Sequence, residues 1–241
     1  MPQTETIRKI AKRLLQDAEK TTSAGLHNGK AGLSLSLFMA ARYLQDESIE
    51  DAAYQLLKES LTIKTGDISF ENGRSGTGYA LLYLIENNYL EADFDEIFGE
   101  QYEMIIKNLS IIEKMPLLLL QLRQAIYFLS KAVGIKKEDN RIPKIIQKFF
   151  EGLELYLIIQ FQDFTDPRYI KNKTEVLNIY RNYRQLVDYS GYKHFSRALS
   201  EDYEDLCRKG VIKNSFESDF HMHHKETPLL SCVNKQLWMC L

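Results

Sequence analysis

The chain has 241 residues, enough for one large or two small domains, and its 44% hydrophobic and 27% charged residues exclude an intrinsically disordered protein. Its 31 basic and 33 acidic side chains give a formal net charge of −2. Because no basic stripe stands out against that balance, we predict no nucleic-acid partner.

Apolar residues recur with helical spacing along most of the chain, and strand signals are scarce. The first amphipathic face runs from Ile7 to Ala18, and a helix buried on most sides follows Gly32. About nine helices joined by short loops are expected, so the predicted fold class is all-α. The expected boundaries are Ser48 with Asp51 as a capping box, Asp93 or Asp95 as a start, Pro116 and Gly134 as the two ends of one helix, Pro143 as a start, and Gly210 as a C-terminal cap.

The predicted domain organisation is a single all-α domain over residues 1–241. Residues 1–210 form its helical body, and residues 211–241 form an irregular C-terminal tail because their periodicity is weaker. Charged residues and a proline crowd together over 163–174, which we interpret as a long loop or a joint between subdomains.

Cysteine usage and the absence of long apolar runs indicate the compartment. The odd, sparse set Cys207, Cys232 and Cys240 does not suggest a disulfide framework. Basic side chains interrupt the N-terminal segment, so we expect no signal peptide. The apolar run 115–120 is broken by Arg123, well short of the roughly 20 residues that a membrane-spanning helix needs. We therefore predict a cytoplasmic protein with no membrane span.

One pattern occurs twice, 44 residues apart, as Asn28-Gly29-Lys30-Ala31-Gly32 and Asn72-Gly73-Arg74-Ser75-Gly76. Each copy leads into an apolar run, 33–41 and 77–85, and a period of this length is typical of stacked or ring-arranged units. The glycine pairs permit a tight turn and close helix packing. They also leave open a second role, in which N–H groups at the helix start face a ligand. Neither copy has the Gly-Lys-Ser/Thr ending of a phosphate loop.

The segments 26–32 and 70–84 resemble the repeated Gly-x-x-Gly turns of the lanthionine synthetase C-like family. The resemblance covers residues 20–110 and implies an α/α toroid, an inner ring of helices within an outer ring. In that fold the Gly-rich turns start the inner helices and face a central cavity. The apolar helices after Gly32 and Gly76 would be inner, and those near Ser48 and Asp93 outer. Because the chain is short for a complete double ring, we expect a shortened or open toroid.

The resemblance also implies chemistry on peptides. The family's cyclases add a cysteine thiol to a dehydrated serine or threonine, with zinc holding the thiolate. They bind that zinc through a Trp-Cys context and a later Cys-His-Gly, and neither occurs in this chain. The predicted cofactor is therefore none, and the predicted metal site is none. His221, His223 and His224 with Cys232 and Cys240 are the one alternative, because zinc accepts such nitrogen and sulfur ligands.

We interpret the chain as a protein of bacterial peptide modification that binds a peptide or protein partner rather than one that performs zinc-dependent cyclisation. Two alternatives remain, a non-enzymatic helical scaffold and a carbohydrate-active toroid. The latter would need paired carboxylates such as Asp67 and Glu71, or Asp163 and Asp166. The candidate binding residues lie at the mouths of the two apolar helices: His27, Asn28, Lys30, Glu71, Asn72 and Arg74.

Overall fold

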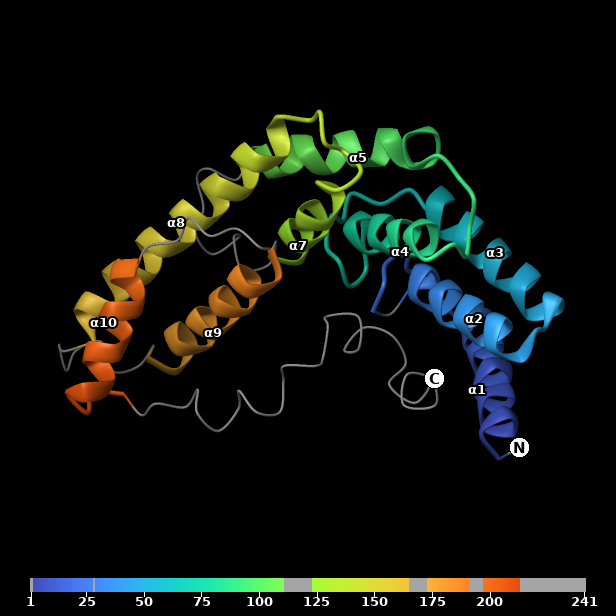
Figure 1. The fold of residues 1–241 in the computed structure, drawn as a ribbon, viewed down its shortest axis with the longest axis horizontal. Helices are drawn as coiled ribbons and strands as arrows, with labels where there is room; N and C mark the ends of the chain where they lie inside the picture. Colours follow the sequence, from blue (N-terminus) through green and yellow to red (C-terminus); the bar gives the residue numbers. More distant parts are fainter. Residues whose placement is uncertain (1, 28, 111–122, 165–172, 191–196, 213–241) are drawn as a thin grey trace. The chain divides into compact units, whose positions relative to one another are not determined.

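A computed structural model describes residues 2–27, 29–110, 123–164, 173–190 and 197–212, and every regular element in those ranges is an α-helix (Figure 1). The all-α prediction is confirmed. In chain order the helices are α1 (Pro2–Ala18), α2 (Lys30–Leu44), α3 (Glu47–Thr62), α4 (Arg74–Glu86), α5 (Phe94–Ser110), α7 (Arg123–Ala132), α8 (Arg141–Asp163), α9 (Lys173–Ser190) and α10 (Arg197–Arg208).

The described residues pack into two compact units that divide between Asn108 and Leu109. The first contains α1 to α4 and nearly all of α5, and the second contains α7 to α10. The charged segment 163–174 lies inside the second unit and is therefore not the joint between the two; residues 165–172 of that segment are outside the described ranges. Of the predicted tail, only residues 211 and 212 are described.

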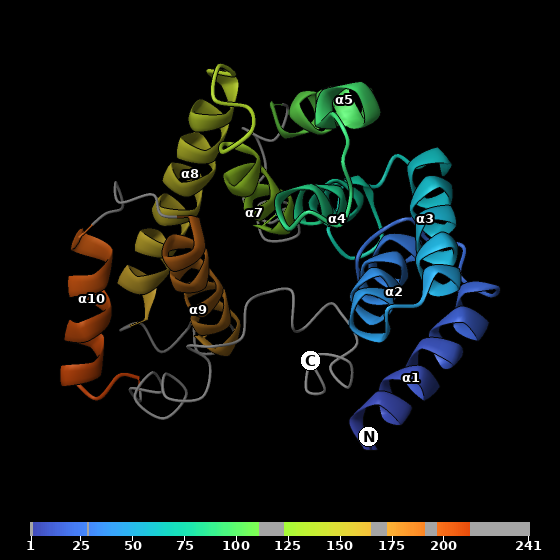
Figure 2. The same ribbon diagram turned by 45° about the vertical axis from the view of Figure 1, so that its right-hand side comes forward.

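Within the first unit, α2 packs against α1, α3 and α4 (Figures 1 and 2). Most of α2 is buried, as is most of α4, whereas α3 buries one face only. That contrast follows from sequence, because α2 and α4 are apolar all round and α3 is amphipathic. The two helices that follow the repeated turns are thus central to this unit, as expected. Closure into a ring stays an expectation.

The start of α3 differs from the prediction. The capping residue is Asp46, whose side chain accepts hydrogen bonds from the N–H groups of Ser48 and Ile49 at 3.1 and 3.3 Å. The predicted capping box from Ser48 to Asp51 is wrong, because Asp46 can serve both orphan N–H groups at once. The hydroxyl of Ser48 also donates to Asp46 at 2.7 Å, and these bonds hold the pKa of the Asp46 carboxyl below its usual value.

Other helix ends agree more closely with expectation. Asp93 caps α5 by accepting from the N–H groups of Asp95 and Glu96 at 2.7 and 3.0 Å. Two residues of α8 precede Pro143, so this proline lies within the first turn rather than at its start. Gly134 follows the end of α7 by two residues, and Pro116 is outside the described ranges.

Gly210 ends α10 as predicted. Its φ is +68°, a left-handed conformation that glycine adopts without steric cost. The Gly210 N–H donates to Cys207 O at 3.0 Å, and the Val211 N–H donates to Leu206 O at 3.0 Å. This pair of bonds is the Schellman motif.

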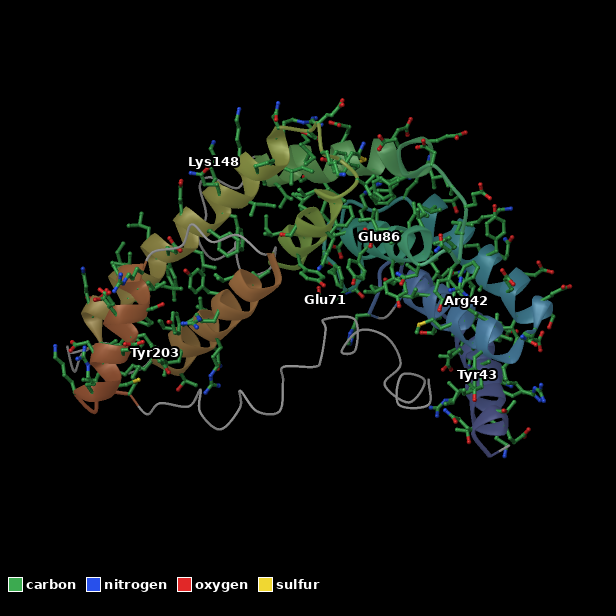
Figure 3. All side chains as sticks on the ribbon, in the orientation of Figure 1. Arg42, Tyr43, Glu71, Glu86, Lys148 and Tyr203 are labelled. Carbon is green, nitrogen blue, oxygen red and sulfur yellow. The ribbon has the colours of Figure 1, made fainter. Side chains whose placement is uncertain are left out.

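The second unit has an aromatic core in which α8 packs against α7, α9 and α10. The ring of Tyr203, which is labelled in Figure 3, stacks on the ring of Tyr180 with centroids 4.6 Å apart, and Phe161 contacts both rings. Beside them, the buried hydroxyl of Tyr183 donates to Glu154 Oε1 at 2.6 Å. No helix of the described residues combines the length and apolar character needed to cross a membrane.

Candidate functional site

The two repeated turns are hydrogen-bonded to each other through their backbones. The N–H groups of residues 25, 26 and 27 donate to the carbonyl oxygens of residues 72, 70 and 71, at 3.1, 3.0 and 2.9 Å. The hydroxyl groups of Ser23 and Thr77 add bonds to Asn72 O at 3.0 Å and to Ala24 O at 3.2 Å. Sequence reasoning missed both hydroxyls. The paired turns, residues 23–27 with 67–73, thus form one structural element from two repeats.

The two copies occupy equivalent places, as the 44-residue period predicts. Gly29 precedes α2 and Gly73 precedes α4, each with extended backbone. The N–H of Lys30 donates to Ser23 O at 2.9 Å, and the N–H of Arg74 donates to Asp67 O at 3.0 Å. Because each bond spans seven residues, the acceptors are themselves 44 residues apart.

The glycines are required by close backbone approach. A Cβ on Gly32 would overlap the carbonyl oxygen of Leu26, and a Cβ on Gly76 would overlap that of Phe70. Gly25 faces the Glu71 carbonyl from the opposite turn with equally little room. The packing role of the Gly-x-x-Gly pairs is confirmed.

The first N–H groups of α2 do not point to a ligand. Those of Lys30, Ala31 and Gly32 donate to the carbonyl oxygens of residues 23, 24 and 25 at 2.9, 3.1 and 3.3 Å. A helix start normally leaves such groups without intrahelical partners, and here the preceding turn supplies the acceptors. The expectation that these N–H groups face a ligand is therefore wrong for α2.

Both basic candidates are bound within the chain. The ammonium of Lys30 forms an ion pair with the Glu59 carboxylate on α3, and this bond lowers the pKa of Glu59. The Nε–H of Arg74 donates to Thr65 O at 2.7 Å. The two side chains therefore tie the starts of α2 and α4 to the end of α3 and the segment after it, a role that helix periodicity does not reveal.

The other candidates lie on the paired turns themselves. His27 and Asn72 are exposed, one from each repeat. Glu71, which is labelled in Figure 3, is half-buried; it precedes Asn72 in sequence, and its carbonyl oxygen accepts from the His27 N–H. Asn28 is outside the described ranges. The structure thus brings His27, Glu71 and Asn72 onto one element, while Lys30 turns toward Glu59 on α3 and Arg74 toward Thr65 in the segment after α3.

At the other end of the same two helices, Arg42 joins α2 to α4. Its guanidinium lies 3.3 Å from the ring centroid of Tyr89 and donates to the carbonyl oxygens of Asn87 and Asn88 (Figure 3). These carbonyls follow the last turn of α4, where a cation is favourable. No sequence pattern marks Arg42, because its partners lie more than 40 residues away.

The carboxylate pairs considered for sugar cleavage stay a prediction. Asp67 accepts a hydrogen bond from the Ser69 N–H at 2.7 Å, which makes it a turn residue. Asp166 lies outside the described ranges.

Comparison with known proteins connects these turns to a family. A family model described as lanthionine synthetase C-like protein matches residues 2–142, more than half of the chain and the whole of the paired-turn element. The chain belongs to the lanthionine synthetase C-like family. No curated protein and no solved structure matches the chain.

In the part of the chain that the structure describes, the zinc of the family's cyclases has no matching donor set. Among the described residues, no three His, Cys, Asp or Glu side chains are grouped so as to hold a metal ion. Cys207 is the free, half-buried cysteine of α10 and is followed by Arg208 rather than by histidine. His221 to His224, Cys232 and Cys240 lie outside the described ranges.

Proposed function

We propose that this family member is a cytoplasmic protein of bacterial peptide modification that binds a peptide or protein partner, and that it does not perform zinc-dependent thioether cyclisation. The observation that carries the proposal is the paired-turn element. It presents His27 and Asn72, exposed and from different repeats, beside the starts of the two most buried helices of the first unit.

The composition of this surface suits a peptide. His27 and Asn72 offer donors and acceptors, and Glu71 adds an acceptor of negative charge. The backbone below them is fixed by hydrogen bonds between the repeats, so binding would order few additional groups. Lys30 and Arg74 support the starts of the two helices through their bonds to Glu59 and to the Thr65 carbonyl.

The test uses one fluorescent peptide that carries a dehydrobutyrine and a cysteine, the two groups that a cyclase would join. Anisotropy of the labelled peptide measures binding by the full chain. Alkylation of the remaining thiol followed by mass spectrometry measures cyclisation, with and without added zinc. We expect binding without loss of the alkylatable thiol. Cyclisation above a sample without protein would overturn the proposal.

The variants separate a binding surface from structural support. His27→Ala with Asn72→Ala changes two exposed side chains, so we expect binding to weaken at least tenfold while the thermal midpoint is kept. Lys30→Ala with Arg74→Ala removes two intrachain contacts, so lost binding is informative only where the midpoint is unchanged. Lys12→Ala with Lys20→Ala, two exposed residues elsewhere in the first unit, is the control. If the His27 and Asn72 changes leave binding intact, the paired turns are not the site.

A further inference from the structure

The asparagine–glycine pair Asn72–Gly73 lies in the turn immediately before α4. The Asn72 side chain is exposed and Gly73 is buried. Within the described ranges, neither the Asn72 side-chain amide nor the Gly73 N–H forms a hydrogen bond with another residue. Buried backbone N–H groups are nearly always paired in folded proteins, so the Gly73 N–H is unusual.

These two groups can react with each other. The Gly73 nitrogen loses its proton to hydroxide and attacks the side-chain carbonyl carbon of Asn72. The bond from that carbon to the amide nitrogen breaks, and the nitrogen takes up a proton and leaves as ammonia. Water then opens the resulting succinimide ring at either carbonyl, which gives aspartate or isoaspartate. In sum, NH2 is replaced by OH, and no oxidant or reductant is needed. Glycine favours the attack because it has no Cβ to obstruct it.

The first repeat supplies hydrogen-bond donors to the same peptide group. The Asn72 carbonyl oxygen, which is conjugated with the Gly73 nitrogen, accepts from the Gly25 N–H at 3.1 Å and from the Ser23 hydroxyl at 3.0 Å. When the nitrogen loses its proton, negative charge spreads onto this oxygen. Donors that already point at the oxygen stabilise that charge, so the pairing of the turns favours the reactive form of the nitrogen.

The other charges around the pair act in both directions. Gly73 is the N-cap residue of α4, where the partial positive charge of the helix start favours a negative group. Two carboxylates oppose it: Glu71 precedes the pair, and the Asp67 Oδ1 lies 2.9 Å from the position that a Cβ on Gly73 would occupy. The two donors from the first repeat are therefore the feature that sets this pair apart from an exposed asparagine elsewhere in the chain.

We propose that Asn72 is a site of spontaneous deamidation in the folded protein, promoted by the Ser23 hydroxyl and the Gly25 N–H of the first repeat. In isoaspartate the main chain runs through the side-chain carbons, so the carbonyl that accepts these two bonds is displaced. Both products also place a negative charge next to Glu71. The modification thus weakens the backbone pairing of the two turns. The proposal does not depend on partner binding by the paired turns.

The test incubates the full chain at 37 °C and pH 8 and follows each asparagine by tryptic digestion. Asn72 is the one asparagine of the peptide 65–74, and Asn108, exposed and followed by leucine, is the one asparagine of the peptide 108–114. Mass spectrometry measures the replacement of NH2 by OH, and synthetic standards separate aspartate from isoaspartate by chromatography. A sample digested before incubation corrects for reaction during the digest.

We expect Asn72 to react at least tenfold faster than Asn108, with isoaspartate among the products, because leucine carries the Cβ that glycine lacks. Asn72→Gln should give no product in this peptide, since glutamine would have to form a six-membered ring. Incubated wild-type chain should have a lower thermal midpoint than fresh chain, whereas incubated Asn72→Gln should keep its midpoint.

Two variants test the role of the first repeat. Ser23→Ala removes one donor to the Asn72 carbonyl and should slow the reaction by about two- to tenfold, the range that one hydrogen bond supports. Ser23→Thr keeps the hydroxyl and should react at the wild-type rate. Circular dichroism checks that both variants are folded, and the comparison of Asn72 with Asn108 needs no variant.

Three results would overturn the proposal. If Asn72 reacts no faster than Asn108, the pair is not a modification site. If the products form in urea-unfolded chain but not in folded chain, the fold protects Asn72. If folded Ser23→Ala reacts as fast as the wild-type chain or faster, the hydroxyl restrains the turn and does not promote the reaction.

Discussion

The backbone N–H of His27 donates to the carbonyl oxygen of Glu71 at 2.9 Å, across 44 residues of sequence. This bond and its two neighbours join the turn before α2 to the turn before α4. A change in either turn therefore affects the packing of both helices. The repeat is consequently a unit of structure as well as a unit of sequence.

The glycine positions give the sharpest stability prediction. Gly76→Ala places a Cβ against the Phe70 carbonyl and the Leu26 backbone, neither of which can move without breaking the bonds between the turns. We expect a loss of about 3 kcal/mol or more in the free energy of unfolding, at or above the upper range for overpacking. Gly32→Ala should cost a similar amount. Urea unfolding followed by circular dichroism measures both.

Gly66 is the matched control, because a Cβ there meets no atom within 4 Å. Gly66→Ala should be neutral or should stabilise by up to about 1 kcal/mol through the unfolded chain. Equal effects at Gly66 and Gly76 would contradict the close approach of the two turns.

The ion pair between Lys30 and Glu59 predicts a titration change. The Lys30 ammonium, followed by the Gln55 amide, holds the pKa of Glu59 below its usual value of 4.5. A lowered folded-state pKa contributes stability that is present above the unfolded value and is lost as the pH falls through the folded value. Lys30→Ala should raise the pKa of Glu59, measured by NMR titration of the carboxyl carbon.

The energetic effect of this pair is small because the Glu59 side chain is 39% exposed. A double-mutant cycle of Lys30→Ala and Glu59→Gln should give a coupling of at most about 0.5 kcal/mol at pH 7, and less at pH 3. A coupling that grows as the pH falls would exclude the ion pair as its source.

The sequence predicts the helices and caps whose signals lie close together in the chain. The apolar runs after Gly32 and Gly76 predict buried helices, and Gly210 predicts the cap of α10, because these signals lie within one or two turns of chain. Hydrogen-bond partners that are distant in sequence could not be predicted from the sequence. The acceptors of Lys30 and Arg42 lie 29 and about 45 residues away, so Lys30 could be placed at a helix mouth but not paired with Glu59. Asp46 was missed because Ser48 offered a plausible competing cap two residues later.

The contacts of Arg42 predict a loss of stability on substitution that a lysine at this position cannot prevent. Its planar group stacks on Tyr89 while two different nitrogens donate to the carbonyls of Asn87 and Asn88. An ammonium cannot reproduce both geometries at once. We expect Arg42→Ala to lower the free energy of unfolding by roughly 1–2 kcal/mol and Arg42→Lys by about 1 kcal/mol. Arg13→Ala, in an exposed pair with Asp17, should cost about 0.3 kcal/mol or less. If the urea midpoint of Arg42→Lys equals that of the wild-type chain, the combined stacking on Tyr89 and double hydrogen bonding of Arg42 is excluded.

The buried bond from Tyr183 to Glu154 predicts stability at alkaline pH. Burial, and then the hydrogen bond to the Glu154 carboxylate, raises the pKa of Tyr183 well above its usual value of 10.0. Since the folded-state pKa is raised, this stabilisation is complete below pH 10 and is lost as the pH rises further, where the unfolded tyrosine ionises first. Tyr183→Phe should cost about 1–3 kcal/mol at pH 7, because Glu154 loses this buried donor.

The difference between wild type and Tyr183→Phe should shrink as the pH rises from 9 to 11, because the phenylalanine variant lacks the ionising group. Glu154→Gln keeps an oxygen that accepts from the hydroxyl, so it should cost less than Tyr183→Phe and should lower the pKa of Tyr183 by removing the negative charge. Tyr54→Phe, at a tyrosine that is 43% exposed, should change neither the stability nor its pH dependence. Urea unfolding at each pH, with tyrosinate absorbance recorded in parallel, measures all three variants. A constant gap between Tyr183→Phe and wild type across this pH range would show that Tyr183 ionises equally in the folded and unfolded chain, contrary to its burial against Glu154.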